Sequence, residues 1–477
     1  MTDPLQATTE ILKHRAEILE LYKAGKRGKA EELARALLNE TPDDAETISI
    51  LAAILIDRNA FAEAENALRR ALELAPHAPI PWINYGRFLQ QHNRWGEALA
   101  HYGQAAERFP DHPLFHGTLG QLAQRAGDFT AAETAYRRAS ALEPRQAVMV
   151  MNIGMVVLRQ NRVDEAAELF QKAAELNPKL AAAWGNLGNA EQKRDNLAAA
   201  EAAYQQAVNL DPRDVMAYVS LGMVKLKRGD MREAADIFER AISKYGPERR
   251  AAAWFPYARA QELGAMPAGF RAELARTISR NKLTPPPGYT SMDELNTALA
   301  EALRADPTIV WEPTGKATRL GGQTGLLLDH PREPFLAFET ALRKAIDAHF
   351  DSIKIEKNHP YFGQVPKTYQ IDMWGTLLSD GGHQHPHIHV GGWMSGVYYV
   401  SLPASMGNGE ETKDGWIEFG HPPPDFNANF APLGIAYEPR EGDAFFFPSY
   451  AFHRTLPFSG TEQRISLAFD IKPTSWR

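Results

Sequence analysis

The sequence predicts a multidomain α + β protein, in which a long all-α repeat array is followed by a β domain of jelly-roll type. Prolines recur every 34 residues through the first half of the chain, a period typical of stacked helix pairs. The last third instead contains short apolar runs broken by Gly, Pro and Asn, which is typical of a β-sandwich or barrel. A chain of 477 residues also exceeds one ordinary hydrophobic core.

The composition limits the classes of function. The chain is 44% hydrophobic and 23% charged, as in globular proteins, and its net charge of −7 favours neither nucleic acid nor an anionic membrane as a partner. It has no cysteine, which excludes disulfides, thiolate metal ligands and a cysteine nucleophile. No signal peptide is visible, and no apolar run approaches the roughly 20 residues of a membrane span. We therefore expect a soluble cytoplasmic protein.

The repeat array is defined by residues at constant offsets from its prolines, which stand at positions 42, 76, 110, 144, 178, 212 and, once more, 247. In the unit that ends at Pro212, the residues at these offsets are Trp184, Gly188, Ala200, Tyr204 and Ala207. Small residues let two helices approach closely, aromatic residues fill the space beside them, and proline begins the next turn. The pattern resembles the tetratricopeptide repeat, with about seven helix pairs between residues 9 and 247.

A row of polar residues marks one face of this array. Asn84, Asn152 and Asn186 occupy the same phase in the first helix of their repeats. Repeat superhelices commonly bind extended peptides on their concave face, and a carboxamide both donates to and accepts from a peptide backbone. The row predicts a groove for a protein or peptide substrate. Alternatively, these residues belong to a solvated helix face.

A proline-rich stretch separates the two parts of the chain. Three prolines in "LTPPPGYTS", residues 283–291, end the helical pattern. We therefore predict a repeat array over 1–250, a helical connector over 251–308 that contains this linker, and a β domain over 309–477.

The β domain contains the stretch "GGHQHPHIHVGGW", with His383, His385, His387 and His389 at every second position. In an extended chain all four imidazoles lie on one side, and clustered histidines are a recognised metal signature. A "VYYV" strand and the glycine-led "GWIEFG" follow, and "FPSYAFHRTLP" then supplies His453. Spacing by itself leaves open which histidines bind the metal.

This order of features resembles the Fe(II)- and 2-oxoglutarate-dependent oxygenases, in particular a prolyl-hydroxylase-like bacterial group that carries tetratricopeptide repeats. The resemblance covers roughly residues 310–477. It implies a double-stranded β-helix that binds Fe(II) and the cosubstrate 2-oxoglutarate, and it allows for ascorbate as an additional cofactor. The metal ligands that it implies are His387, His389 and His453.

The same resemblance implies a basic residue that binds the distal carboxylate of 2-oxoglutarate about ten positions after the last histidine. Arg464 stands eleven residues past His453. Its planar guanidinium can make paired bonds to a carboxylate. Ser466, two residues on, and Tyr399, on the "GVYYV" strand, can add hydroxyl donors to the same group. We expect no catalytic residue beyond the metal ligands.

Position 389 departs from the family pattern, because it carries histidine where an aspartate or glutamate is usual. Three outcomes are open: three histidine ligands, two histidines with water or a remote carboxylate, or a site that no longer catalyses. The nearest carboxylates, Asp380, Glu410 and Asp414, do not have suitable spacing. His383 and His385 are then expected to lie at the entrance of the metal site or to contact the metal ligands from outside.

The favoured hypothesis is a dioxygenase that hydroxylates a protein or peptide recruited by the repeat groove. The alternative is a non-catalytic tetratricopeptide scaffold whose β domain is a degenerate metal-binding module. A zinc hydrolase of the same fold is a third possibility. It would have no use for Arg464 as a keto-acid anchor.

Overall fold

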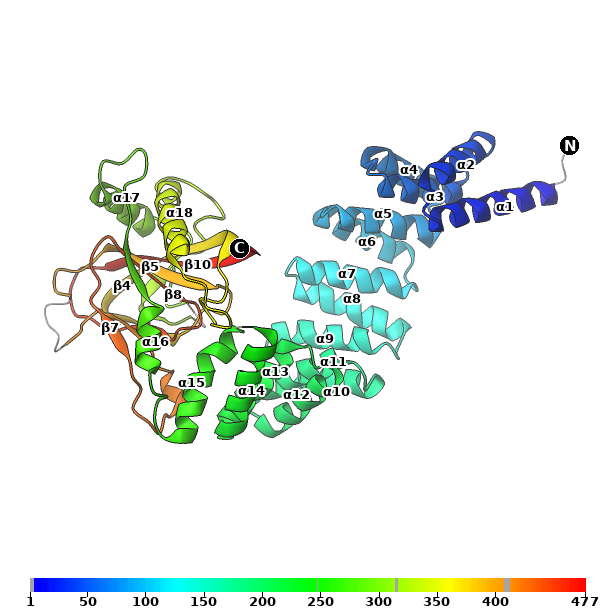
Figure 1. The fold of residues 1–477 in the computed structure, drawn as a ribbon. Coiled ribbons are helices and arrows are strands. Elements are labelled where there is room, and N and C mark those ends of the chain that lie inside the picture. The colour runs from blue at the N-terminus through cyan, green and yellow to red at the C-terminus, as the bar shows by residue number, and fades with distance from the viewer. Residues whose placement is uncertain (1–3, 247, 314–315, 407–411) are drawn as a thin grey trace. The chain divides into compact units, whose positions relative to one another are not determined.

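The computed structural model describes residues 4–246, 248–313, 316–406 and 412–477, so that Pro247 and Glu410 lie outside the described residues. By packing, the chain divides into two compact units, Met1–Leu210 and Asp211–Arg477 (Figure 1).

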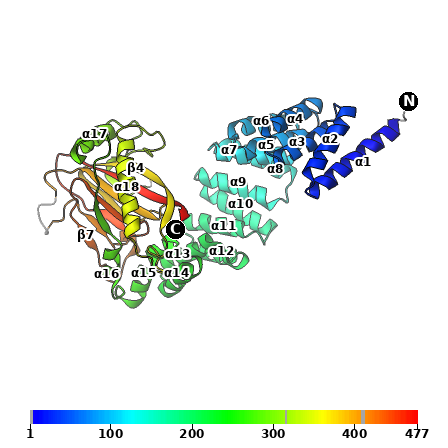
Figure 2. The same ribbon diagram turned by 45° about the horizontal axis from the view of Figure 1, so that its top comes forward.

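The first unit consists of antiparallel helix pairs, seen from a second angle in Figure 2. Its helices are α1 (Pro4–Lys23), α2 (Arg27–Glu40), α3 (Ala45–Asp57), α4 (Phe61–Leu74), α5 (Pro79–Gln91), α6 (Trp95–Arg108), α7 (Pro113–Arg125), α8 (Phe129–Leu142), α9 (Ala147–Arg159), α10 (Val163–Leu176), α11 (Ala181–Lys193) and α12 (Leu197–Leu210). A Cβ added to Gly154 or Gly188 would lie 2.7 Å from the ring of Phe170 or Tyr204. The repeated glycine is therefore needed where the second helix of each pair places its aromatic residue.

The second unit begins with further helices, α13 (Val215–Arg228), α14 (Met231–Tyr245), α15 (Arg249–Leu263), α16 (Phe270–Arg276), α17 (Met292–Arg304) and α18 (Phe335–Ser352). Among the described residues, α1 to α14 form seven consecutive pairs, as the 34-residue period predicts.

The rest of the second unit is an antiparallel β domain. Its strands are β1 (Ser279–Lys282), β2 (Val310–Trp311), β3 (Thr318–Gln323), β4 (Pro366–His387), β5 (Met394–Ser401), β6 (Ile417–Phe419), β7 (Ile435–Tyr437), β8 (Asp443–Pro448), β9 (His453–Thr455) and β10 (Arg464–Trp476). They pair in the order β1-β8-β5-β10-β4-β9-β6-β7, and β3 adds to β4 and β2. The long strand β4 pairs first with β10 and, near its end, with β9. The predicted fold class, a tetratricopeptide superhelix followed by a double-stranded β-helix, is confirmed.

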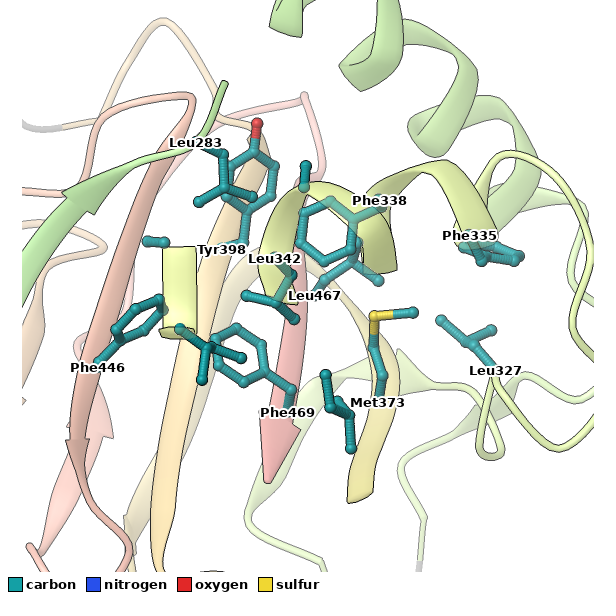
Figure 3. Close-up of a cluster of buried hydrophobic side chains, with 14 of the residues drawn as sticks. Leu283, Leu327, Phe335, Phe338, Leu342, Met373, Tyr398, Phe446, Leu467 and Phe469 are labelled. Carbon is teal, nitrogen blue, oxygen red and sulfur yellow. The ribbon is translucent and has the colours of Figure 1, made fainter. Parts of the chain in front are cut away.

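Strand alternation gives the sheet two different faces. On one face, Met373 of β4 and Leu467 and Phe469 of β10 are fully buried. They pack with Phe338 and Leu342 of α18, which covers this face (Figure 3). The intervening residues of the same strands point to the opposite face, where polar side chains collect.

The segment predicted as a connector packs into the second unit. Strand β1 pairs with β8 along its whole length, and Leu283 of the proline-rich stretch is buried in the core. Asn296 of α17 accepts a hydrogen bond of 2.7 Å from the hydroxyl of Tyr398. The boundaries at 250/251 and 308/309 thus stay predictions, while packing divides the chain at 210/211.

Helix α15 carries apolar residues on two faces. Ala251 and Ala258 pack with α14, whereas Trp254 and Tyr257 pack against Phe452, with ring centroids 4.9 and 5.5 Å apart. Phe452 directly precedes β9. The helix is therefore a structural part of the β domain.

We expect Trp254→Ala to lower the unfolding free energy of the second unit by about 2–3 kcal/mol, somewhat less than for a fully buried tryptophan. The substitution removes ring contacts with Phe426 and Phe452. Urea unfolding of the full chain measures the effect. The control is Leu263→Ala at the end of α15, where the side chain is 64% exposed and a change within about 0.5 kcal/mol is expected. Equal shifts in the two variants would contradict the packing role of α15.

His349 of α18 makes stability depend on pH. Burial lowers the pKa of His349 to about 4, and its Nε2 lies 3.2 Å from the hydroxyl of Tyr361. The unfolded chain, with a histidine pKa near 6.5, therefore takes up the proton first as pH falls. This contribution to stability is fully present above about pH 6.5 and is lost toward pH 4.

Between pH 7 and pH 5, wild type should therefore lose about 2 kcal/mol more unfolding free energy than His349→Gln, at about 1.4 kcal/mol per pH unit below 6.5. Urea denaturation at the two pH values measures this difference. A difference between the proteins that does not change with pH would contradict the prediction.

Candidate metal centre

Two distant segments bring three of the predicted histidines together. His387 ends β4 and is the register partner of His453, which begins β9. His389 follows two residues after the end of β4. The potential ligand atoms of the three residues all lie within 4.8 Å of one another. Three imidazoles at such separations could reach one metal ion.

Each of these imidazoles is oriented by a hydrogen bond at Nδ1. His387 and His453 face the backbone oxygens of His385 and Ala451 at 2.7 and 3.0 Å. His389 faces Oδ1 of Asp470 at 2.6 Å. Because all three partners are oxygen acceptors, we assign the hydrogen to Nδ1. Nε2 of each ring is then left with its lone pair for a metal.

The protonation of the cluster suits metal binding. Burial, reinforced by His389 nearby, lowers the pKa of His387 to about 4. Burial, with His387 and His389 nearby, also holds the pKa of His453 well below its usual range. Both rings are therefore neutral at pH 7, which is the form that binds a metal. Imidazole ligands suit iron and zinc alike.

The histidine ladder does not continue as one row. The register shifts between Gln384 and His387, and His389 lies beyond the strand. His383 and His385 contact each other, with ring centroids 5.0 Å apart, and lie outside the group of three. The expectation that all four imidazoles share one side is therefore wrong, because a bulge interrupts the alternation.

The three histidines line a cavity of about 640 Å³ on the polar face of the sheet. Strand register arranges part of this face. Ser466 on β10 is flanked by Thr376 on β4 and by Tyr399 on β5. Arg464, two residues before Ser466, lines the same cavity. Arg464, Ser466 and the three histidines therefore line one cavity, whereas Tyr399 lies against Arg464, with the guanidinium carbon 5.0 Å from the centre of its ring.

Arg464 is a buried cation without an anion. Its side chain is 1% exposed, and among the described residues it forms no ion pair with a carboxylate. Its Nε and Oγ1 of Thr376 are buried without a hydrogen-bond partner within the described chain, and its guanidinium lies against Tyr399. Burial raises the pKa of Tyr399 to about 12, so that its phenol remains a donor. A buried guanidinium is costly unless it is paired, so this cluster fits a bound carboxylate.

Sequence reasoning missed two polar residues of the site. Thr376 could be found only from the pairing of β4 with β10, and Asp470 only from its contact with His389. Of the carboxylates considered from spacing, Glu410 lies outside the described residues. Asp380 accepts a hydrogen bond from the backbone N–H of Gly460, and neither Asp380 nor Asp414 belongs to the group of three.

The polar row of the repeat array lies on the first helices of the pairs, as predicted. Asn84, Asn152 and Asn186 are half-buried on α5, α9 and α11. Asn152 and Thr118 line a cavity of about 990 Å³ formed by α7, α8 and α9. The role of the row in peptide binding stays a prediction.

Comparison with known families agrees with the two-part architecture. Residues 15–79, 118–181, 186–248 and 220–278 match the tetratricopeptide repeat, a module of protein interaction. Residues 372–470 match the family described as "Putative 2OG-Fe(II) oxygenase". The chain is thus a fusion of tetratricopeptide repeats with a domain of this oxygenase family. No curated protein matches it.

Solved structures with similar helices include the Cut9–Hcn1 hetero-tetramer of the APC/C, at 22% identity and a TM-score of 0.37. The match covers 50% of this chain and 48% of that one, so this chain spans about half the length of that relative. YrrB, a TPR protein with an unusual peptide-binding site, is 21% identical over 39% of this chain and 95% of its own, with a TM-score of 0.35. MamA from Desulfovibrio magneticus RS-1 is 23% identical over 34% and 92%, with a TM-score of 0.33.

Among the described residues, no helix is both long and apolar enough to cross a membrane.

Proposed function

We propose that the β domain is an Fe(II)- and 2-oxoglutarate-dependent dioxygenase that hydroxylates a protein or peptide. The unpaired, buried Arg464 in the same cavity as the three histidines carries this proposal. A zinc hydrolase needs a metal and water, but it has no use for a buried cation that awaits a carboxylate. A keto acid that binds metal at one end and Arg464 at the other accounts for both features.

In this proposal His387, His389 and His453 hold iron through Nε2. When bound, iron and 2-oxoglutarate would supply the oxidising chemistry. One oxygen atom of O₂ goes to succinate, which forms from 2-oxoglutarate with loss of CO₂, and the other converts a C–H bond of the substrate to C–OH. Arg464, Ser466 and Tyr399 bind the distal carboxylate of 2-oxoglutarate, with Thr376 as a further donor. Burial of these groups excludes water from the anchor and strengthens each charged contact.

The repeat array is proposed to recruit the substrate. Tetratricopeptide arrays bind proteins or extended peptides, and the asparagine row offers both donors and acceptors to a backbone. A peptide substrate is therefore favoured over a free metabolite. The proposed location is the cytoplasm, and ascorbate is the proposed reductant that maintains iron in the ferrous state.

The test is succinate formation by the full-length protein with Fe(II), 2-oxoglutarate, ascorbate and O₂. Succinate that requires both iron and O₂ is the expected result, and turnover without added substrate is expected to be slow. Anaerobic calorimetry with Mn(II)-loaded protein separately measures 2-oxoglutarate binding. A protein that neither binds 2-oxoglutarate nor retains iron would favour the scaffold alternative. Hydrolytic activity with zinc, in the absence of O₂ and keto acid, would favour the hydrolase.

A further inference from the structure

Among the described residues, Asp470 is a carboxylate in direct contact with the histidine cluster. Its Oδ1 accepts from Nδ1 of His389 at 2.6 Å and from the hydroxyl of Ser395 at 2.6 Å. Ser395 is fully buried, and its side chain also contacts the hydroxyl of Ser449 at 2.8 Å. Asp470 itself is only 8% exposed. The aspartate is therefore held rigidly on the side of His389 that faces away from the proposed metal.

The loop that carries His389 is built around this contact. The backbone N–H of His389 donates to the oxygen of Ser449 at 2.9 Å. A Cβ at Gly392 would lie 2.6 Å from Oγ of Ser449 and 3.2 Å from Cβ of Asp470, so only glycine lets the loop pass so close to the aspartate. Arg249 of α15 donates to the backbone oxygen of Gly392 and forms no ion pair with Asp470. Together, these contacts keep the imidazole of His389 on Asp470.

Other buried carboxylates of this domain are paired with permanent cations. Asp443 is bound by Arg280 and Lys282, and Asp306 is bound by Arg332. Within the described chain, the only ion-pair partner of Asp470 is His389. Besides this imidazole, Asp470 accepts a hydrogen bond from the uncharged hydroxyl of Ser395, so among the described residues no permanent cation is in contact with the carboxylate. A cation on the far nitrogen of that imidazole would complete the pairing.

We infer that Asp470 is a positioning residue that supplies, through His389, the negative charge that the missing carboxylate ligand would bring to the metal directly. The inference rests on the proposed function, because it requires a metal at the histidine cluster. A carboxylate that accepts from the outer nitrogen of a ligating histidine fixes the ring and raises its basicity as a ligand. With histidine at position 389, the positive charge of the metal is therefore still balanced by a nearby carboxylate, that of Asp470.

The experiment is a titration of the metal-free, full-length protein with Co(II), followed by its visible absorption, with affinities set by a competing chelator. Asp470→Asn keeps an acceptor for His389 but removes the charge, and we expect about 10- to 100-fold weaker binding. Ser395→Ala should weaken binding in the same direction by less. Asp372→Asn is the matched control, because Asp372 lies opposite Asp470 on β4 but is paired with Lys472. We expect a change of less than about threefold for it.

A double-variant cycle distinguishes charge supply from a merely structural role. His389→Asp restores a direct carboxylate and places it beside Asp470. In this background no imidazole links Asp470 to the metal, so Asp470→Asn should change Co(II) affinity much less than the roughly 10- to 100-fold expected with His389 in place. Thermal unfolding of the metal-free variants checks that each one folds.

The outcomes separate the inference from the proposed function. Wild-type affinity in Asp470→Asn, or the same loss in both backgrounds, would overturn the role of Asp470 while the metal site stands. A wild-type protein that binds no Co(II) would overturn the metal site and the inference together.

Discussion

Replacing His453 by alanine is expected to weaken metal binding by more than about 100-fold and to abolish succinate formation. Replacing a residue that only hydrogen-bonds to a metal ligand lowers metal affinity by about 10- to 100-fold, and His453 would itself be a ligand. It is also the one member of the group that β9 contributes, opposite His387 of β4. Without it, two neighbouring residues of one segment are left to hold the ion.

Metal content after dialysis and a Co(II) titration measure this effect. The matched control is His383→Ala, because His383 belongs to the same histidine-rich stretch but lies outside the group of three. It should retain wild-type affinity. A fully metal-loaded His453→Ala protein would refute the assignment of the centre, provided that its metal-free form unfolds like that of wild type.

Replacing Arg464 by methionine is expected to have two effects of opposite sign. Affinity for 2-oxoglutarate should fall by roughly 2–5 kcal/mol, or about 30- to 5000-fold, because the carboxylate loses a buried charged partner. The ligand-free protein should instead become more stable, by about 1–4 kcal/mol, because methionine fills the space of a buried charge that has no anion. A purely structural arginine would give a loss of stability.

Calorimetric titration of 2-oxoglutarate into anaerobic Mn(II)-loaded protein and urea denaturation of the metal-free protein measure the two effects. Arg454→Met is the control, because Arg454 is paired with Glu418 and does not line the cavity. Unchanged 2-oxoglutarate affinity in Arg464→Met would refute the anchor role.

Local signals account for what could be predicted. The helix pairs follow from a 34-residue period, because each pair is built from neighbouring segments and repeats the same contacts, such as Gly188 against Tyr204. The β domain and its candidate ligands follow from alternation and from the order of motifs. Spacing left open which histidines bind the metal, and the resemblance to the oxygenase family implied His387, His389 and His453.

Contacts between distant segments account for what was missed. Asp470 lies 81 residues from His389, and the hydrogen bond between them depends on the pairing of β10 with β5. Strand β1 has no alternating apolar pattern of its own and is a strand because it pairs with β8. The bulge after Gln384 that divides the histidine ladder arises where β4 moves from one partner strand to another.

By itself, the sequence determined the architecture and the chemical types at the site, since both depend on periodicity and residue identity along the chain. Only the tertiary structure decided which imidazoles converge, that Arg464 is buried without an anion, and that Asp470 stands behind His389. These features depend on strand register, which joins residues far apart in the chain, and no local pattern specifies that register.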